Sequence, residues 1–363
     1  MPVDPTLSEL TTLRLGGPAG RLLQARAEQE VVAAVRAADA SGEPLLVLAG
    51  GSNVVVADAG FSGAVVQILT RGIARSELAD GRMRLDVQAG ENWDALVAAC
   101  VQDGLAGVEA LSGIPGSVGA TPIQNVGAYG QEVSRVLVGV RAYDRVSEES
   151  CVLAPEDCQF AYRSSVFKRH PHRWVILEAS YALARRELSD PVRYAELARR
   201  LQIELGARAP LGDVRATVLE LRRGKGMVLD PDDPDSVSAG SFFTNPILDE
   251  RAFAELERRA ASRLGPGAAP PAWRQPDRSV KTSAAWLIER ADFARGHGNP
   301  DGIAISSKHT LALTNRGAGT AAELVALAHE IAGGVRDAFG VELVPEPVFV
   351  GHRWQMPAAT VGP

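Results

Sequence analysis

The sequence has little that would place the protein in a membrane or an oxidising compartment. Its 363 residues include only three cysteines, Cys100, Cys151 and Cys158, an odd number whose spacing matches no common zinc motif. We therefore expect reduced thiols and no disulfide framework. No apolar run approaches the ~20 residues that span a bilayer, and the first ten residues lack the basic and apolar segments of a signal peptide. These absences predict a cytoplasmic protein.

Basic residues are also fewer than acidic ones. Lysine and arginine total 38, aspartate and glutamate total 44, and the formal net charge is −6. Because nucleic acids are bound by a positive field, we expect no nucleic-acid partner. No cluster of His, Cys, Asp and Glu has the spacing of a metal site, and no heptad or apolar stripe indicates an oligomer. We expect a monomer without a metal.

The chain shows no internal repeat, and its composition is 46% hydrophobic and 23% charged. A chain of this length predicts roughly two or three domains, with cores large enough to need no disulfide. Strands and helices are interspersed throughout, which predicts a mixed α/β or α+β fold. The expected units are residues 1–69, 70–220 and 221–340, with a C-terminal strand at about 341–363 returning to the first unit.

Hydrophobic periodicity predicts the main elements. Helices are expected at residues 28–40, 93–102, 194–205, 213–224, 253–264, 282–291 and 320–339. Asn92 and Asp213 are candidate caps, and Gly340 would end the last helix. Strands are expected at residues 21–25, 44–48, 54–57, 64–69, 84–88, 136–144, 174–183, 302–306, 311–314 and 341–350. The acidic, proline-broken stretch 230–235 is predicted to be an exposed loop.

Glycine is abundant, with 36 residues, and it gathers in two loops. One is residues 49–53, directly after an apolar strand, and the other is residues 111–130. Glycine permits positive φ and close backbone approach, so such loops can direct several amide N–H groups at one anion. Tight turns would use the same residues, but a loop of nearly twenty residues is more typical of a ligand site.

Neither loop has the spacing of a common nucleotide-binding motif. The pattern G-x-G-x-x-G at a strand–helix turn is missing from both. The triplet at residues 224–226, Gly-Lys-Gly, does not have the spacing of a phosphate-binding P-loop. A dinucleotide held by these loops would therefore be held by a different fold.

Six short segments, in order along the chain, carry a resemblance to one enzyme family. They are 50–53 (GGSN), 113–130 (GIPGSVG, then QNVGAYG), 162–168 (YRSSVFK), 239–246 (AGSFFTNP), 284–288 (AAWLI) and 345–351 (PEPVFVG). Each string is moderately specific, and six in the same order are highly specific. The chain resembles the UDP-N-acetylenolpyruvoylglucosamine reductases, and among them the longer, type I branch.

The resemblance implies an α+β fold with a vanillyl-alcohol-oxidase (PCMH)-type FAD-binding domain. Residues 1–69 and 70–220 would be its two subdomains, and residues 221–340 a C-terminal substrate-binding domain. It implies FAD as cofactor, NADPH as hydride donor and a UDP-sugar enolpyruvyl ether as substrate, reduced in peptidoglycan precursor synthesis. The implied cofactor-binding residues lie in the glycine-rich loops: Gly50, Gly51, Ser52, Asn53, Gly113, Ile114, Pro115, Gly116, Ser117, Gly119, Asn125, Gly127, Ala128 and Tyr129.

The implied reaction needs donors for a developing anion and a source of one proton. Hydride addition to the enolpyruvyl methylene leaves negative charge on the neighbouring carbon and its carboxylate. The resemblance assigns Arg163 and Glu346 to stabilising that charge and Ser241 to donating the proton. The residues alone leave ordinary alternatives open. These are a surface salt bridge for Arg163, an edge-strand carboxylate facing water for Glu346 and a turn serine for Ser241.

The resemblance also implies four substrate-binding residues: Tyr162, Tyr194, Lys225 and Asn245. Lys225 would meet phosphate or carboxylate, and Tyr194 would close over the diphosphate, unless it only packs at a helix start. Two features depart from the family pattern. The loop 226–238 is longer and more acidic, and Thr244 stands where many relatives carry lysine.

Two other functions are compatible with parts of the chain. A different oxidase or dehydrogenase on the same flavin fold would have an unrelated second domain without the segments 239–246 and 345–351. A non-catalytic flavin or nucleotide-sugar binder would not need the three catalytic candidates together. His297 and His309 are interpreted as surface turn residues.

Overall fold

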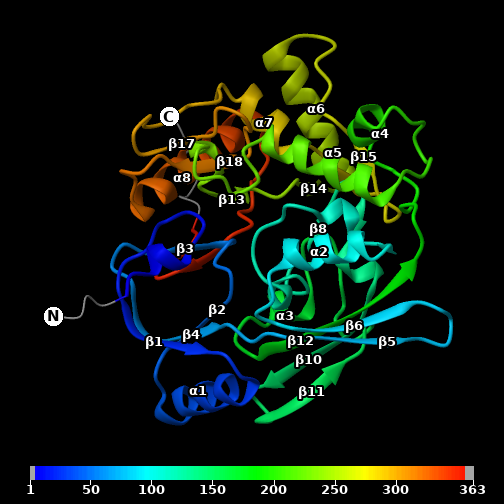
Figure 1. Ribbon diagram of the computed structural model, residues 1–363. Coiled ribbons are helices and arrows are strands. Elements are labelled where there is room, and N and C mark those ends of the chain that lie inside the picture. The colour runs from blue at the N-terminus through cyan, green and yellow to red at the C-terminus, as the bar shows by residue number, and fades with distance from the viewer. Residues whose placement is uncertain (1–4, 356–363) are drawn as a thin grey trace. The chain divides into compact units, whose positions relative to one another are not determined.

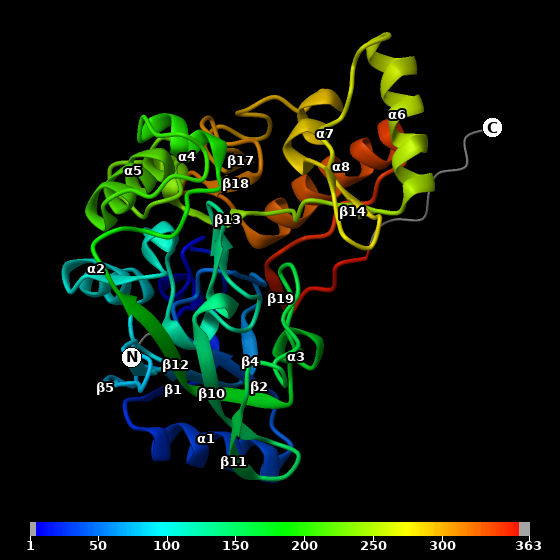
Figure 2. The same cartoon turned by 90° about the vertical axis from the view of Figure 1, so that its right-hand side faces the viewer.

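The computed structural model describes residues 5–355 and forms two compact units (Figures 1 and 2). Unit 1 contains Pro5 and residues 19–51 and 61–229, and unit 2 contains residues 6–18, 52–60 and 230–355. The chain thus passes between the units repeatedly. None of the helices within residues 5–355 combines the length and the apolar character that a membrane span requires.

The N-terminal part of unit 1 is a small parallel sheet covered by one helix. Its strands lie in the order β1 (Ala19–Ala25), β4 (Phe61–Ile68) and β2 (Leu45–Leu48). Helix α1 (Glu28–Ser41) lies below them in Figure 1 and buries Val31 and Val35 in the same core as Val66. Gly42 ends the helix with φ 68°, in the left-handed region that a Cβ disfavours.

A larger antiparallel sheet forms the centre of unit 1. Its strands lie in the order β11 (Glu149–Leu153), β10 (Leu137–Asp144), β12 (Trp174–Arg185), β6 (Met83–Gln88) and β5 (Ile73–Glu77), and β7 (Leu105–Ala106) pairs with the end of β12. Helix α2 (Trp93–Gln102) begins at Asn92, whose side chain accepts the N–H of Ala95, as expected. Trp93 and Tyr181 belong to the same core as α1, so one core serves both sheets.

Short elements complete unit 1. They are the 3-10 turns η2 (Glu109–Leu111), η3 (Val118–Ala120) and η4 (Val133–Arg135), the hairpin of β8 (Gly127–Ala128) and β9 (Gln131–Glu132), and the helices α3 (Val166–Arg169), α4 (Ala195–Arg200) and α5 (Leu211–Arg223). Helices α4 and α5 share a separate small core that includes Leu197 and Val218.

Unit 2 packs helices on a three-stranded sheet (Figure 2). The sheet order is β13 (Ser238–Ser241), β18 (Ala312–Asn315) and β17 (Ile303–Ile305), all antiparallel. Helix α8 (Ala321–Phe339) has a capping box of Thr320 and Glu323 and ends at Gly340, as expected. The remaining elements are η1 (Leu7–Leu10), η5 (Pro234–Ser236), β14 (Ile247–Leu248), α6 (Glu250–Leu264), β15 (Trp273–Arg274), β16 (Val280–Lys281) and α7 (Ala284–Arg290).

A parallel pair joins distant parts of the sequence within unit 2. Strand β3 (Val54–Val56) pairs in register with β19 (Val348–Val350), seen in Figure 1 as a blue strand beside a red one. The N–H of Val348 also donates to the carbonyl of Asn53 at 2.9 Å. The strand expected over residues 341–350 is shorter than predicted, because Pro345 and Pro347 have no N–H for a ladder.

Three other predictions about local structure were wrong. Strand β5 was missed because all five of its residues are exposed, which removes the alternation that marks a strand. Asp213 does not cap α5, which begins after Pro210, so its carboxylate lies within the first turn. The stretch 230–235 is only partly an exposed loop, since Asp235 is 2% exposed and η5 begins at Pro234.

Candidate active site

The two glycine-rich loops meet in unit 1. The N–H of Gly50 donates to the Oγ of Ser117 at 2.9 Å. A Cβ on Gly50 would lie 2.6 Å from the Cα of Gly116, a distance at which the backbone would have to move. Gly51, Gly113 and Gly116 all have positive φ. Backbone proximity therefore dictates glycine at position 50, and it brings two glycine-rich segments together.

The start of the second loop is fixed by a partly buried ion pair. The N–H of Gly113 donates to Asp94 Oδ1 at 2.6 Å, and Arg215 of α5 bonds both carboxylate oxygens at 2.6 and 3.0 Å. Burial raises the pKa of Asp94, but the bonds from Arg215 and from Gly113 lower that pKa more, so Asp94 stays ionised. Half-buried Ile114 and Pro115 continue the loop.

The rest of the loop packs against the large sheet and the segment that carries Arg163. A Cβ on Gly119 would lie 2.6 Å from the Cβ of Ala89, so only glycine fits there. Buried Asn125 donates to Glu132 at 3.1 Å and to the carbonyl of Ala161 at 3.3 Å. This second bond ties residues 125–129 to residues 161–164.

Arg163 lies against this loop. It has φ 51° in a tight turn closed by a bridge between Ala161 and Ser164. Its Nη2 donates to the carbonyl of Gly127 at 2.7 Å, and its Cζ lies 5.6 Å from the ring centre of Tyr162. The structure thus brings Arg163 and Tyr162 together with the loop residues Gly127 and Ala128.

Tyr129, Tyr194 and Lys225 form a second group within unit 1. The two tyrosine rings pack edge to face with centroids 5.2 Å apart. Lys225 Nζ pairs with Glu196 Oε2 at 2.9 Å. Burial lowers the pKa of Lys225, but the bond to Glu196 and nearby charges raise this pKa on balance, so the ammonium stays charged. Tyr129 and Arg193 also line a cavity of about 210 Å³.

One residue near this group was missed in the sequence. Arg222 of α5 is 7% exposed, and burial lowers its pKa. Its Nη2 donates to the carbonyl of Met227 at 2.8 Å, while its Nε has no partner among the described residues. A Cβ on Gly113 would lie 3.3 Å from that Nε. The only signal in the sequence is its place three residues before Lys225, and it adds a positive charge beside the glycine loop.

Ser241 and Glu346 meet in unit 2. Ser241 ends β13, and the N–H of Glu346 donates to the carbonyl of the next residue, Phe242, at 2.8 Å. The Nδ2 of Asn53 donates to the carbonyl of Glu346 at 3.3 Å. Gly240 has φ 74° immediately before the serine. The backbone therefore places two of the three catalytic candidates, and Asn53, side by side.

The residues that follow Ser241 are tied to the same corner. The Oδ1 of Asn245 accepts the N–H of Ala284, the first residue of α7, at 3.0 Å. The hydroxyl of Thr244 donates to the carbonyl of Val344 at 3.3 Å, two residues before Glu346. Thr244 thus makes a backbone contact.

The predicted site residues are divided between the units. Arg163, Tyr162, Tyr194 and Lys225 belong to unit 1, while Ser241, Asn245 and Glu346 belong to unit 2. The first glycine loop is itself divided, because Gly50 and Gly51 fall in unit 1 and Ser52 and Asn53 in unit 2. Each unit assembles its own part of the predicted set.

The cysteines form no disulfide in the part of the chain that the structure describes. The three cysteines are free thiols, and burial raises the pKa of Cys100 and of Cys158 to about 12, so both stay protonated. Across residues 5–355, no group of three or more His, Cys, Asp and Glu side chains is placed to hold a metal ion.

Comparison with known proteins decides the family. An FAD-binding domain model matches residues 19–148, and the model of the UDP-N-acetylenolpyruvoylglucosamine reductase C-terminal domain matches residues 232–350. The UDP-N-acetylenolpyruvoylglucosamine reductase of Thermobifida fusca is 55% identical over 345 residues, covering 95% of this chain and 96% of the relative. The chain belongs to the UDP-N-acetylenolpyruvoylglucosamine reductase family. The Streptomyces coelicolor member is 56% identical over 96% of this chain and 90% of its own.

As a member of this reductase family, the protein is an oxidoreductase and an FAD-dependent flavoprotein. The crystal structure of the family member from Thermus caldophilus superposes with a TM-score of 0.62 at 22% identity, covering 95% of this chain and 97% of that one. The expected fold class is confirmed: a PCMH-type FAD-binding domain with a C-terminal α+β domain.

Proposed function

We propose that the protein reduces UDP-N-acetylglucosamine enolpyruvate to UDP-N-acetylmuramate with NADPH as hydride donor, in the cytoplasm, for peptidoglycan precursor synthesis. The observation that carries this proposal is that Ser241 and Glu346 lie side by side, because the N–H of Glu346 donates to the carbonyl of Phe242, the residue after Ser241. The chain that contains them is 55% identical to a named reductase over nearly its whole length. FAD, when bound, carries the hydride from NADPH to the substrate.

The cofactor would be held by backbone groups of the glycine-rich loops. Gly51 and Gly116 have positive φ and no side chain, so their backbone could approach a diphosphate closely, and Ser52, Asn53 and Ser117 would add short polar side chains. Asp94 holds the loop through Gly113. In this assignment the FAD-binding subdomains are residues 1–69 and 70–220, residues 221–340 bind substrate, and the enzyme is a monomer.

Arg163 would bind the carboxylate of the enolpyruvyl group. A guanidinium stays charged and grips a carboxylate through two parallel bonds. Its five N–H donors allow it to keep the bond to the Gly127 carbonyl while doing so. Since charge develops on that carboxylate during reduction, the grip strengthens as the reaction proceeds and so lowers the barrier.

Ser241 would deliver the proton, and Glu346 would donate a hydrogen bond to the developing anion. A serine hydroxyl is a weak acid, but a carbanion is a strong base, so a positioned hydroxyl suffices. The positive φ of Gly240 allows a side-chain-free approach before the serine. On the substrate side, Lys225 would meet phosphate or carboxylate, Tyr194 would cover the diphosphate, and Tyr162 and Asn245 would orient the substrate.

The proposal is tested by the two half-reactions in stopped-flow absorbance. In Ser241→Ala, bleaching of the flavin by NADPH should proceed at the wild-type rate. Reoxidation by the enolpyruvyl substrate should fall by about 10³ or more, because one positioned acid is lost. Wild-type reoxidation in this variant would remove Ser241 from the mechanism, and an unbleached flavin in the wild type would refute the choice of NADPH.

A further inference from the structure

His309 lies next to Ser241 in unit 2. Its Nε2 is 3.4 Å from the serine Oγ. The sequence predicted an idle surface turn here, but the side chain is only partly exposed and follows the buried Ser306. A separation of 3.4 Å is long for a hydrogen bond, as catalytic hydrogen bonds often are before a ligand closes the site.

The turn that carries His309 is organised by Ser306. This residue is 0% exposed, and its Oγ accepts the N–H of Lys308 at 3.0 Å and of His309 at 3.2 Å. The carbonyl of His309 accepts the N–H of Ala312, the first residue of β18, at 3.0 Å. Because β18 pairs with β13 at Ser241, the imidazole and the hydroxyl project from neighbouring, hydrogen-bonded segments.

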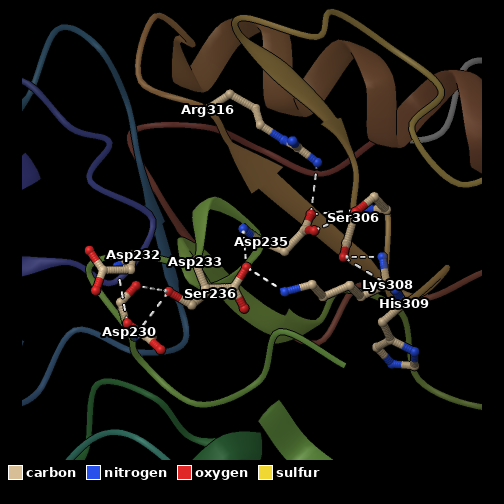
Figure 3. Close-up of polar contacts among 10 residues, drawn as sticks. Asp230, Asp232, Asp233, Asp235, Ser236, Ser306, Lys308, His309 and Arg316 are labelled. Atoms are coloured by element: carbon tan, nitrogen blue, oxygen red, sulfur yellow. Dashed lines mark hydrogen bonds and ion pairs between the residues drawn. The ribbon is translucent and has the colours of Figure 1, made fainter. Parts of the chain in front are cut away.

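A buried carboxylate from another segment, Asp235 of η5, holds the same turn in place. Asp235 is 2% exposed. Its carboxylate accepts two hydrogen bonds from Ser307, one from the N–H at 3.0 Å and one from the hydroxyl at 2.6 Å, and a third from Arg316 Nη2 at 2.8 Å. Burial raises the pKa of Asp235, but the bonds from Ser307 and the charge of Arg316 lower this pKa on balance, so the anchor is ionised. Figure 3 shows Asp235 between Arg316 and the turn.

A second ion pair continues this anchor. Lys308 Nζ pairs with Asp233 Oδ1 at 2.8 Å, and Asp233 also accepts the N–H of Asp235 at 3.1 Å. The Oγ of Ser236 accepts the N–H of Asp230 at 3.1 Å and donates to the carbonyl of Asp230 at 2.8 Å (Figure 3). The acidic stretch 230–235 is thus the clamp that fixes the turn of His309.

A proton donor works only if its hydrogen points at the substrate. If the serine hydroxyl donated to a neighbour, that hydrogen would be withheld from the carbanion. An imidazole Nε2–H that donates to Oγ occupies an oxygen lone pair and leaves the hydroxyl hydrogen to point elsewhere. The charged groups of the clamp form two ion pairs, Lys308 with Asp233 and Arg316 with Asp235. The imidazole of His309 is therefore the polar group that the turn places beside Ser241.

We propose that His309 is a positioning residue for the reductive step: it holds the Ser241 hydroxyl by donating from Nε2 to Oγ. The inference rests on the proposed function of Ser241. His309 acts through the serine and takes no part in the reduction of the flavin by NADPH.

The test measures both half-reactions in His309→Ala, His309→Gln and the control His297→Ala. His297 is the matched control because it is a unit 2 histidine paired with Glu330 on the exposed face of α8. His309→Ala should keep wild-type flavin reduction and lose about 10- to 100-fold in reoxidation, as expected for one lost orienting bond. His309→Gln, which retains an N–H donor, should recover most of the rate, and His297→Ala should match the wild type.

A double variant separates this role from a structural one. In Ser241→Ala there is no hydroxyl to position, so adding His309→Ala should cause no further loss. Additive losses, wild-type reoxidation in His309→Ala, or failure of glutamine to rescue would each overturn the proposal. If Ser241→Ala itself reoxidises normally, the proposed function of Ser241 fails instead, so the two failures are distinguishable.

Discussion

At the scale of single residues, the site was predictable where the residue type is forced by the backbone. Gly50 and Gly119 stand where a Cβ would meet another chain segment, and such demands leave a mark in the sequence as clustered glycine. His309 left no such mark, and Arg222 left only its place three residues before Lys225. Their neighbours come from β13 and from the loop around Gly113, far away in the sequence, and no local pattern shows such contacts.

The lack of space for a Cβ at Gly50 gives a prediction with a matched control. Gly50→Ala should lose bound FAD, because its Cβ would lie 2.6 Å from the Cα of Gly116 and push the two loops apart. Gly212→Ala meets nothing within 4 Å and lies in helix α5, so it should keep its flavin and gain up to about 1 kcal/mol in stability. Absorbance at the flavin bands of the purified proteins measures both. Full flavin content in Gly50→Ala would show that the loops can separate without cost to binding.

At the scale of elements, the sequence predicted the long amphipathic helices, but it did not predict an exposed edge strand or a short turn in an acidic stretch. Helix α8 has a capping box, an apolar face and a terminal glycine, so local preference and burial agree. Strand β5 lies at a sheet edge with every residue exposed, and η5 forms in an acidic stretch that reads as solvent-facing. In η5 the burial of Asp235 depends on Ser307 and Arg316, which the local sequence does not contain.

That buried carboxylate gives a prediction with a pH dependence. Asp235→Asn should destabilise unit 2 by about 1–3 kcal/mol near neutrality, because Arg316 and Ser307 lose a charged acceptor. The pKa of Asp235 is lowered in the folded state from an ordinary 3.8. Its stabilising contribution is therefore complete above that ordinary pKa and is lost as the pH falls through the folded pKa. The wild-type and variant free energies of unfolding, from urea titrations, should differ most above pH ~5 and converge in acid. A difference that grows in acid would contradict the ionised anchor.

At the scale of the whole molecule, the chain passes repeatedly between two units with separate cores. The family's sequence motifs predicted site residues in both units, since Arg163 falls in one unit and Ser241 with Glu346 in the other. What they could not give is the assignment of short segments such as residues 6–18 and 52–60 to unit 2. That assignment depends on pairings like β3 with β19 across almost three hundred residues.

The separation of the two cores predicts which regions the bound cofactor should stabilise. A ligand that binds only the folded state stabilises the regions it contacts, so FAD should slow amide hydrogen exchange most in the glycine-rich loops, residues 50–53 and 113–130. Helices α6 and α7 belong to the other core and should change little. Hydrogen exchange with mass spectrometry on FAD-stripped and FAD-loaded protein measures this directly. Equal protection of both cores would show that the two units open as one cooperative block. Protection confined to helices α6 and α7 would place the cofactor outside the loops that carry the proposal.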